Sequence, residues 1–485
     1  SYLRQEGCPS GCSMQSAVAK GCKRALRRRN PFSARFLLST VTGATSFSIE
    51  EIPTPFVLVS IHRVKRNIRK MSKRAAEGGV SLRPHAKTHK SLNIARLQLD
   101  MGAVGLCVAR AHEAIVFLEG LPGLPSITVT YPFLSPREVA RLCEAAAVAN
   151  CDLRLVVDSA AGLTSIRRGL AVLAASGRPP LLQPPGVYLK VDVGLGRCGV
   201  PVSHPERAVR LAADVLSEPT RLRFCGLLSH SGHAYACAGR DQVVAAAVGE
   251  AWATDAVRRF IEGTLDVVVP EVSVGSTPTE LVRESYYGLD EVRPGNYVFL
   301  DCTAVRMGLA VLDDVALTVV STVVSASDEF YIIDAGSKAL SSDLGAHGTA
   351  PAAVGAGAGG DGSGGGVAAA IGFGGGGAVA LGGFGGGAGR AAPALPDHGV
   401  AFAAPRYDEA LAAASYRAQR RGRLDWPPAG SFSVARLSEE HGWLRRDPQL
   451  PQPRLAVGDR VRVLPSHACP VVNLSDELLV ETGGT

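Results

Sequence analysis

The chain lacks the features that mark membrane-spanning and disulfide-rich secreted proteins. None of its apolar runs approaches the roughly 20 residues that a membrane-spanning helix needs. Its 11 cysteines include no C-x-x-C pair, and three of them, Cys8, Cys12 and Cys22, fall within the first 49 residues. We therefore expect no membrane partner. We expect most of the remaining cysteines to be small buried side chains in a reducing compartment.

The positive charge is confined to one end of the chain. The 51 basic and 44 acidic side chains give a net charge of +7, but residues 1–49 hold eight of the bases and a single acid, so the rest is neutral. A nucleic-acid-binding surface needs its excess charge on the folded domain, so we expect no nucleic-acid partner. Residues 1–49 are rich in Arg, Ser and Ala, which is typical of a disordered organelle transit peptide. We expect a mitochondrial or plastid location, or a cytoplasmic one if the segment is only a basic arm.

Strand and helix patterns alternate over residues 50–290. Residues 54–77, "TPFVLVSIHRVKRNIRKMSKRAAE", predict a strand followed by a helix, and "LRLVVDS", "GVYLKVDVG" and "RLRFCGLLSH" are further strand candidates. About eight such strands favour an α/β fold built as a (β/α)₈ barrel rather than an open sheet. Active-site residues of a barrel should follow its strands.

The remainder of the chain has a β-rich pattern with one interruption. The segments "ALTVVSTVVSASDEFYIIDAG", "SFSVARLSEEHGWLRR" and "GDRVRVLPSHACPVVNL" predict an antiparallel β domain formed by residues 291–344 and 396–485. Residues 345–395 are almost entirely Ala and Gly. Such a segment cannot bury enough side chain to offset its ordering entropy, so we expect a disordered insertion without chemistry.

A basic cluster, "RPHAKTHK" at residues 83–90, follows a predicted strand. Its side chains should therefore lie at the mouth of the barrel. Lys87 is suited to hold a carbonyl cofactor covalently, because neighbouring cations and burial both favour a deprotonated amine. Taken alone, the cluster is better explained as a basic surface turn.

A glycine-rich turn, "GLGRCG" at residues 194–199, matches the G-x-G-x-x-G pattern of dinucleotide-binding folds. Pro201 and Pro205 interrupt the place where the helix of such a fold must start. The turn is better explained as a strand end that delivers Lys190, Asp192 and Arg197 to a cofactor.

Two further polar segments follow predicted strands. "SHSGHAY" contains His230, His233 and Tyr235. The two histidines, three residues apart, could be metal ligands on a helix, or contacts to substrate or a cofactor ring on a loop. "VGSTPT" is a small hydroxyl-rich turn with free backbone N–H groups, which makes it a candidate phosphate cradle. Its candidate residues are Gly275, Ser276 and Thr277.

A histidine and a cysteine lie two residues apart in "PSHACPVVNL". On a strand, His467 and Cys469 would face the same side. One imidazole and one thiolate suit zinc, and two protein ligands would leave positions open for water and substrate, as in a catalytic site. The alternative is a buried cysteine beside an unrelated histidine.

Together, these segments resemble the D-serine dehydratase and D-threonine aldolase family. Seven motifs occur in the family's order between about Thr54 and about Leu474: "RPHAKTHK", "KVDVGLGRCGV", "SHSGHAY", "VGSTPT", "RPGNYVFLD", "LSEEHGWL" and "PSHACPVVNL". The resemblance implies an alanine-racemase-like fold, with an N-terminal barrel that binds pyridoxal 5'-phosphate (PLP) and a C-terminal β domain. It also implies a homodimer in which the β domain completes the neighbour's site.

The resemblance implies roles for the candidate residues. Lys87 would hold PLP, Arg197 would lie near the ring hydroxyl, and Tyr235 would face the ring or its nitrogen. His467 and Cys469 would bind Zn²⁺ or another divalent cation near the substrate hydroxyl. The other residues expected around the cofactor are His85 and, at the phosphate, Gly275, Ser276, Thr277 and Tyr297.

One more motif of the resemblance has an open role. "LSEEHGWL" contains Glu440 and His441, which either line the entrance of the site or form a structural turn between strands.

The resemblance leaves two reactions open. A D-serine dehydratase eliminates water from D-serine or related 3-hydroxy D-amino acids, giving pyruvate and ammonia from D-serine, with Lys87 taking the α-proton. A D-threonine aldolase instead breaks the Cα–Cβ bond to give glycine and acetaldehyde. The thiolate of Cys469 suits zinc and favours the dehydratase, whereas manganese or magnesium would prefer oxygen ligands. A non-catalytic PLP-binding protein would resemble a lone barrel, so the β domain argues against it.

Overall fold

The computed structural model describes residues 49–178, 180–345, 397–421 and 426–481, and the statements below concern these ranges. Nearly all of the predicted transit peptide and of the Ala/Gly insertion lies outside them. Within these ranges, none of the helices has the length and apolar character to cross a membrane. All eight cysteines in these ranges are free, and five of them are buried.

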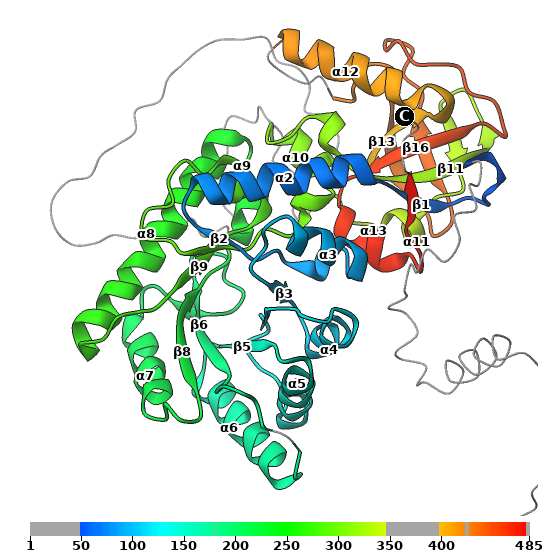
Figure 1. Ribbon diagram of the computed structural model, residues 1–485. Helices are drawn as coiled ribbons and strands as arrows, with labels where there is room; N and C mark the ends of the chain where they lie inside the picture. The colour runs from blue at the N-terminus through cyan, green and yellow to red at the C-terminus, as the bar shows by residue number, and fades with distance from the viewer. Residues whose placement is uncertain (1–48, 179, 346–396, 422–425, 482–485) are drawn as a thin grey trace, which may run out of the picture.

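The N-terminal domain is a barrel of eight parallel strands in the spatial order β2-β10-β9-β8-β6-β5-β4-β3 (Figure 1). His85, just after β2, forms an isolated parallel bridge with Cys107 of β3, which joins the two end strands. The prediction of a (β/α)₈ barrel is therefore confirmed. The strands are β2 (Ser81–Leu82), β3 (Leu106–Val108), β4 (Ser126–Val129), β5 (Asp152–Val157), β6 (Gly186–Asp192), β8 (Arg223–Leu228), β9 (Val272–Val274) and β10 (Glu291–Val292).

Helices cover the outside of the barrel, and their ends carry clear local signals. The helix α5, for example, begins with a capping box between Ser135 and Glu138, has Pro136 in its first turn and ends at a left-handed Asn150. The others are α2 (Ile61–Glu77), α3 (Leu92–Asp100), α4 (Ala111–Gly120), α6 (Ala160–Ala175), α7 (Pro205–Leu216), α8 (Arg240–Leu265) and α9 (Thr277–Val282), with α5 spanning Pro136–Ala149.

The glycine-rich turn after β6 does not lead into a helix. Asp192 Oδ1 accepts hydrogen bonds from the N–H groups of Gly194 and Gly196, both at 3.1 Å. The chain then forms the short strand β7 (Val200–Pro201), and the next helix begins only at Pro205. This geometry differs from a dinucleotide-binding turn, in which the helix follows directly.

The C-terminal domain is a small antiparallel barrel. Its strands follow the order β12-β15-β14-β13-β16-β11, and β11 also pairs with β12, which closes the ring. The helices around it include α10 (Cys302–Arg306), α11 (Ser337–Leu340), α12 (Tyr407–Arg421) and α13 (Ala468–Leu474). The strands are β11 (Leu317–Ala326), β12 (Phe330–Ile333), β13 (Gly399–Ala403), β14 (Phe432–Leu437), β15 (Gly442–Arg445) and β16 (Arg460–Pro465).

Two strands lie in a different domain from the one that the sequence pattern indicated. The strand β1 (Phe56–Ser60) pairs antiparallel with β11 and parallel with β17 (Leu479–Glu481), so it belongs to the C-terminal sheet. The strand β10 pairs with β2 and β9, so the parallel barrel extends to residue 292. The boundary of 50–290 is wrong at both ends because an apolar strand pattern does not identify its partner.

The two domains share one apolar core. Val64 and Ile68 of α2 and Val292 of β10 are fully buried in the same cluster as Val319 of β11 and Phe432 of β14. Figure 1 shows α2 lying between the barrel and the β domain. This contact brings α13 of the β domain over the carboxyl ends of the barrel strands, where a barrel enzyme has its active site.

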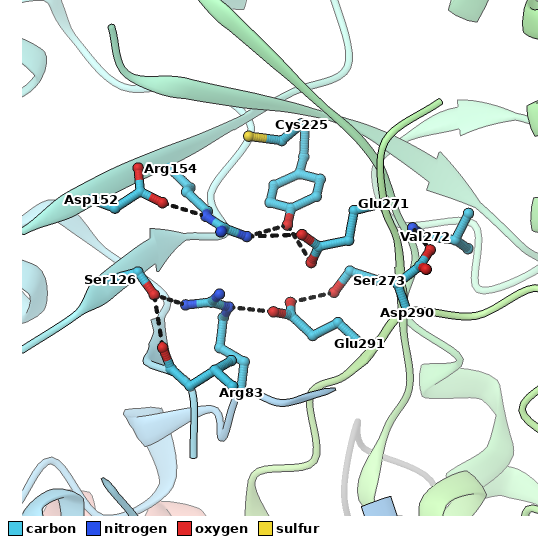
Figure 2. A network of polar contacts seen from close by, with 12 residues as sticks. Arg83, Ser126, Asp152, Arg154, Cys225, Glu271, Val272, Ser273, Asp290 and Glu291 are labelled. Carbon is cyan, nitrogen blue, oxygen red and sulfur yellow. Dashed lines mark hydrogen bonds and ion pairs between the residues drawn. The ribbon is translucent and has the colours of Figure 1, made fainter. Parts of the chain in front are cut away.

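A polar network fills part of the barrel interior (Figure 2). Arg83 is 2% exposed and donates from Nε to Glu291 Oε2 at 2.6 Å and from Nη1 to Ser126 Oγ at 2.5 Å. Ser273 Oγ donates to Glu291 Oε1 at 2.7 Å and accepts from Arg293 Nε at 2.7 Å. Four strand ends are thus tied together by side chains inside a barrel whose strands β2 and β10 are only two residues long.

Candidate functional site

A cavity of about 330 Å³ lies at the carboxyl ends of the barrel strands, with α13 on its far side. This volume is within the range of roughly 300–1,000 Å³ that is usual for small-molecule sites. The cavity brings together segments from residues 85 to 473. The predicted residues that line it are His85, Lys87, His230, Tyr235, Ser276, Thr277, His467 and Cys469.

Lys87 lies in the short helix η3 (Ala86–Thr88), five residues after the end of β2. Burial lowers the pKa of its amine, and the positive charges of Arg197 and Arg293 lower it further, against the attraction of Cys469. A lowered pKa favours the neutral amine, which is the form that attacks a carbonyl. The expectation of a deprotonated lysine therefore has two physical causes in the structure.

His85 is a neutral imidazole in a defined tautomer. Burial lowers its pKa well below the ordinary value, and repulsion by Lys87 adds to the effect. Its Nδ1 accepts the backbone N–H of Lys87 at 3.5 Å, and its Nε2 lies 3.2 Å from Thr130 Oγ1. Since Thr130 gives its own proton to Val108 O at 3.0 Å, Nε2 must be the protonated ring nitrogen. His85 thereby holds the start of η3 and orients Lys87.

The hydroxyl-rich turn after β9 is partly used by the protein itself. The N–H of Gly275 donates to Glu250 Oε1 at 3.1 Å, and the N–H of Ser276 donates to Thr279 Oγ1 at 3.0 Å. The expectation that these backbone groups are free is therefore wrong. The buried carboxylate of Glu250, which also accepts a hydrogen bond from Arg283 Nη2 at 2.8 Å, takes the N–H of Gly275 that a bound anion would need. The backbone N–H groups of Gly275 and Ser276 therefore already have partners within the protein.

Tyr235 and Thr277 face each other across this part of the cavity. The Tyr235 hydroxyl is hydrogen-bonded to Thr277, and burial raises the pKa of the phenol far above its ordinary value. Thr277 Oγ1 also accepts the N–H groups of Gly295 and Tyr297, both at 3.2 Å. The phenol is thus protonated and held in place, as a hydrogen-bond donor must be.

His467 and Cys469 are in contact with each other, although they do not lie on a strand. The strand β16 ends at Pro465, His467 caps α13 and Cys469 lies in the first turn of this helix. Pro470 fits there because a first-turn residue needs no helical N–H partner, and Asp301 Oδ2 accepts the N–H of Ala468 at 3.0 Å. The expectation that both residues lie on a strand is therefore wrong, because β16 ends before His467.

Each side chain of this pair stabilises the charged form of the other. Burial would raise the pKa of the Cys469 thiol, but His467, Thr88 and Lys87 together hold it below its ordinary value. Burial would lower the pKa of His467, but Cys469, Asp301 and Asp343 raise it to about 9. Thr88 Oγ1 lies 3.3 Å from Cys469 Sγ, and Asp343 Oδ2 lies 3.0 Å from His467 Nδ1.

The pair is compatible with a metal ion that keeps open positions. One thiolate and one imidazole form a borderline-soft pair that suits zinc. Among the residues that the structure describes, no group of three or more His, Cys, Asp or Glu side chains is arranged to hold a metal. A metal at this place would therefore take its remaining ligands from water or substrate.

Three of the cofactor residues that the resemblance implied do not line the cavity, and neither do Lys190 and Asp192. Arg197 is exposed, but its positive charge helps to lower the pKa values of Lys87 and His85. Gly275 reaches the site only through its backbone, where His230 Nδ1 lies 3.2 Å from its carbonyl oxygen. Tyr297 is 1% exposed, and its hydroxyl accepts Gln98 Nε2 at 3.0 Å in the apolar core, so its side chain points away from the expected phosphate site.

Several lining residues were not singled out by the sequence. Arg293 and Asn296 follow β10 in the motif "RPGNYVFLD", whose position after a strand was the available signal. Lys90 and Glu113 form an ion pair at 3.5 Å, and nothing in the sequence indicated that they meet. Asp343 borders the Ala/Gly segment and could not be linked to His467 by spacing.

The motif "LSEEHGWL" forms an exposed turn between β14 and β15. Glu440 lies 2.7 Å from Lys338, and neither Glu440 nor His441 lines the cavity. Within this chain the motif forms a turn between two strands.

Comparisons with known proteins match both domains. A model of the alanine racemase N-terminal domain matches residues 59–302, and a serine dehydratase domain model matches residues 316–481. The chain is 33% identical to D-threo-3-hydroxyaspartate dehydratase of Delftia sp. (strain HT23) over 61% of its own length and 74% of that protein. It is 31% identical to D-serine dehydratase of Dictyostelium discoideum over 61% of its own length and 76% of that protein.

The fold also matches solved structures. A cysteine-to-alanine variant of D-threo-3-hydroxyaspartate dehydratase, in its metal-free form, superposes with a TM-score of 0.66 at 26% identity. The superposition covers 89% of this chain and 94% of that one. The shared architecture is the parallel barrel followed by the antiparallel β domain.

Proposed function

The chain belongs to the alanine-racemase-like family of PLP-dependent lyases that includes D-serine dehydratases and D-threonine aldolases, and we propose that it is itself a D-serine dehydratase. It would convert D-serine, and related 3-hydroxy D-amino acids, by loss of water, giving pyruvate and ammonia from D-serine. The observation that carries this proposal is that Lys87 and the His467–Cys469 pair line the same cavity. A base for the α-proton and a group acting on the β-hydroxyl are the two parts that elimination needs.

The residues of the cavity can be assigned to these two parts. PLP, when bound, stabilises negative charge at the α-carbon of an amino acid. Lys87 would hold PLP and then, as a neutral amine, take the proton from Cα. His85 orients Lys87 through the backbone N–H of Lys87, and Tyr235 is held in the cavity by its hydrogen bond with Thr277. The hydroxyls of Ser276 and Thr277 would serve the phosphate.

The metal is part of the proposal. A divalent ion would be held by His467 and Cys469, and its Lewis acidity would make the β-hydroxyl a better leaving group. The support is the lowered pKa of the Cys469 thiol and the existence of a metal-free form of the related dehydratase variant. Asp343 at Nδ1 of His467 would leave Nε2 as the metal-binding nitrogen, since ligating histidines commonly give their other nitrogen to a carboxylate.

The reaction is tested by identifying the carbonyl products. Purified protein loaded with PLP and zinc is incubated separately with D-serine and D-threonine. We expect pyruvate from D-serine and 2-oxobutyrate from D-threonine. Glycine and acetaldehyde from D-threonine, with little pyruvate from D-serine, would make the chain an aldolase instead.

Replacing Cys469 with aspartate separates the two metal chemistries. We expect Cys469→Asp to lower the rate of D-serine elimination by about 10- to 100-fold, and to shift the preferred ion from zinc towards manganese, because a carboxylate is a harder ligand. The measurement is pyruvate release at saturating D-serine with each metal. Cys237→Ser, at a half-buried position that does not line the cavity, is the matched control. Unchanged zinc dependence and unchanged elimination in Cys469→Asp would contradict the metal assignment.

We also propose that the protein forms a homodimer and is located in an organelle. A homodimer is supported by the family resemblance, and sedimentation of the holoenzyme tests it. An organellar location is supported by the basic, acid-poor composition of residues 1–49.

A further inference from the structure

Lys90 has an unusual backbone for a lysine. Its φ is +48°, in the left-handed region that residues with a bulky side chain rarely adopt. Two of the other positive-φ residues, Asn150 and Asp266, end helices and are of types that tolerate this conformation. In Lys90, the conformation is held by its own N–H, which donates to Ala86 O at 2.8 Å. Such a conformation persists only where the surroundings fix it, and it is a reason to look for a function.

The left-handed turn directs the Lys90 side chain into the cavity. Lys90 lines the same cavity as Lys87, and its side chain is 23% exposed. Its Nζ lies 3.5 Å from Oε1 of Glu113, which is only 4% exposed. The other oxygen of Glu113 accepts the N–H of Ala109 at 2.9 Å, just before α4 begins. The ammonium is therefore placed by a carboxylate that is itself anchored to the backbone.

The other cations of the cavity are engaged by the protein. Arg293 donates from Nε to Ser273 Oγ at 2.7 Å and from Nη2 to the carbonyl oxygens of Ser273, at 3.3 Å, and of Ser229. His467 pairs with Asp343 and Cys469. Lys87 is reserved for the cofactor in the proposed function. The Lys90 ammonium has three donors, and such a group can serve Glu113 and a second carboxylate together.

We propose that Lys90 binds the α-carboxylate of the amino-acid substrate, and that Glu113 is the positioning residue for its ammonium. This inference rests on the proposed function only in taking an amino acid as the substrate. It applies equally to elimination and to aldol cleavage, since both substrates carry the same carboxylate. The chemical class that Lys90 recognises is thus an α-carboxylate beside an amine.

The test compares two ligands that differ only in this group. D-Alanine carries the carboxylate and lacks the hydroxyl that leaves, whereas D-alaninamide has a neutral amide in place of the carboxylate. Both are titrated into the PLP-loaded protein, and binding is followed by the change in cofactor absorbance. The variants are Lys90→Met, Lys90→Arg and Glu113→Gln, with Lys73→Met as the control, because Lys73 is an exposed lysine of α2.

We expect Lys90→Met to weaken D-alanine binding by about 10- to 100-fold, as for loss of a hydrogen bond to a charged group, and D-alaninamide binding by less than about 3-fold. Lys90→Arg should restore part of the preference for D-alanine, and Glu113→Gln should reduce it less than Lys90→Met does. Lys73→Met should bind both ligands as the unmodified protein does.

Equal weakening of both ligands by Lys90→Met would overturn the proposal, because it would show a structural role. Unchanged D-alanine binding would overturn it as well. If Lys90→Met fails to fold, the preference measured in Lys90→Arg and Glu113→Gln decides, and an unchanged preference in both counts against Lys90. The dehydratase proposal fails separately, through the products formed from D-threonine, because neither titration ligand has a β-hydroxyl.

Discussion

Replacing Lys87 with alanine is expected to lower kcat for D-serine elimination by about 10³- to 10⁴-fold, the largest loss for any single substitution in the cavity. The residue has two tasks in the proposed function, since it holds the cofactor and takes the proton from Cα. Both depend on the neutral amine that burial and the neighbouring cations favour. The measurement is pyruvate release at saturating D-serine and PLP.

A matched control and a chemical readout make this prediction specific. Lys70→Ala removes an exposed lysine of α2, which pairs with Asp314 at 2.6 Å, and should leave the rate unchanged. Borohydride reduction of the loaded protein, followed by peptide mass mapping, should place the cofactor on Lys87. A cofactor label on Lys190, a buried lysine whose pKa is also lowered by burial, would contradict the assignment.

Replacing Arg83 with methionine is expected to reduce the free energy of unfolding by about 3–5 kcal/mol. The substitution leaves Glu291, which is 1% exposed, as a buried carboxylate without its guanidinium partner (Figure 2). Burial alone would raise the pKa of Glu291, but Arg83 holds it below its ordinary value. The pair therefore stabilises the fold above pH of about 4.3, the usual pKa of glutamate, and loses this contribution as the pH falls through the lower folded value.

The double variant Arg83→Met/Glu291→Leu distinguishes a lost attraction from an uncompensated charge. We expect it to recover most of the stability, because replacing both members of a buried pair with apolar groups is often close to neutral. Chemical unfolding followed by circular dichroism is the measurement. Lys73→Met, which breaks the exposed pair with Glu77, should cost less than about 0.5 kcal/mol. A loss below about 1 kcal/mol in Arg83→Met would show that the network contributes little.

Local patterns in the sequence were sufficient for much of the fold. The alternation of apolar strands and amphipathic helices predicted the parallel barrel, and signals such as Ser135, Pro136 and Glu138 fixed helix ends. These features depend on neighbours within a few residues. The same holds for the rule that places Lys87, Tyr235 and Thr277 at the mouth of the barrel, since it needs only their position after a strand.

Long-range contacts account for the expectations that were wrong. The strand β1 pairs with β11, about 260 residues later, and no local pattern distinguishes this partner from a barrel strand. Tyr297 turns into the core towards Gln98, and the N–H of Gly275 is taken by Glu250. In these last two cases a distant side chain binds a group that the sequence alone leaves free.

The sequence by itself determined the class of the fold and the residue types of the chemistry, a lysine after a strand and an imidazole two residues from a thiol. These follow from periodicity and from the intrinsic reactivity of side chains, which do not depend on distant neighbours. Only the tertiary structure decided which groups work together: that Lys87 shares a cavity with His467 and Cys469, that Asp343 contacts His467, and that Glu113 fixes Lys90. Those pairings come from the packing of two domains around one core, and contacts of that kind are made by folding, not by spacing along the chain.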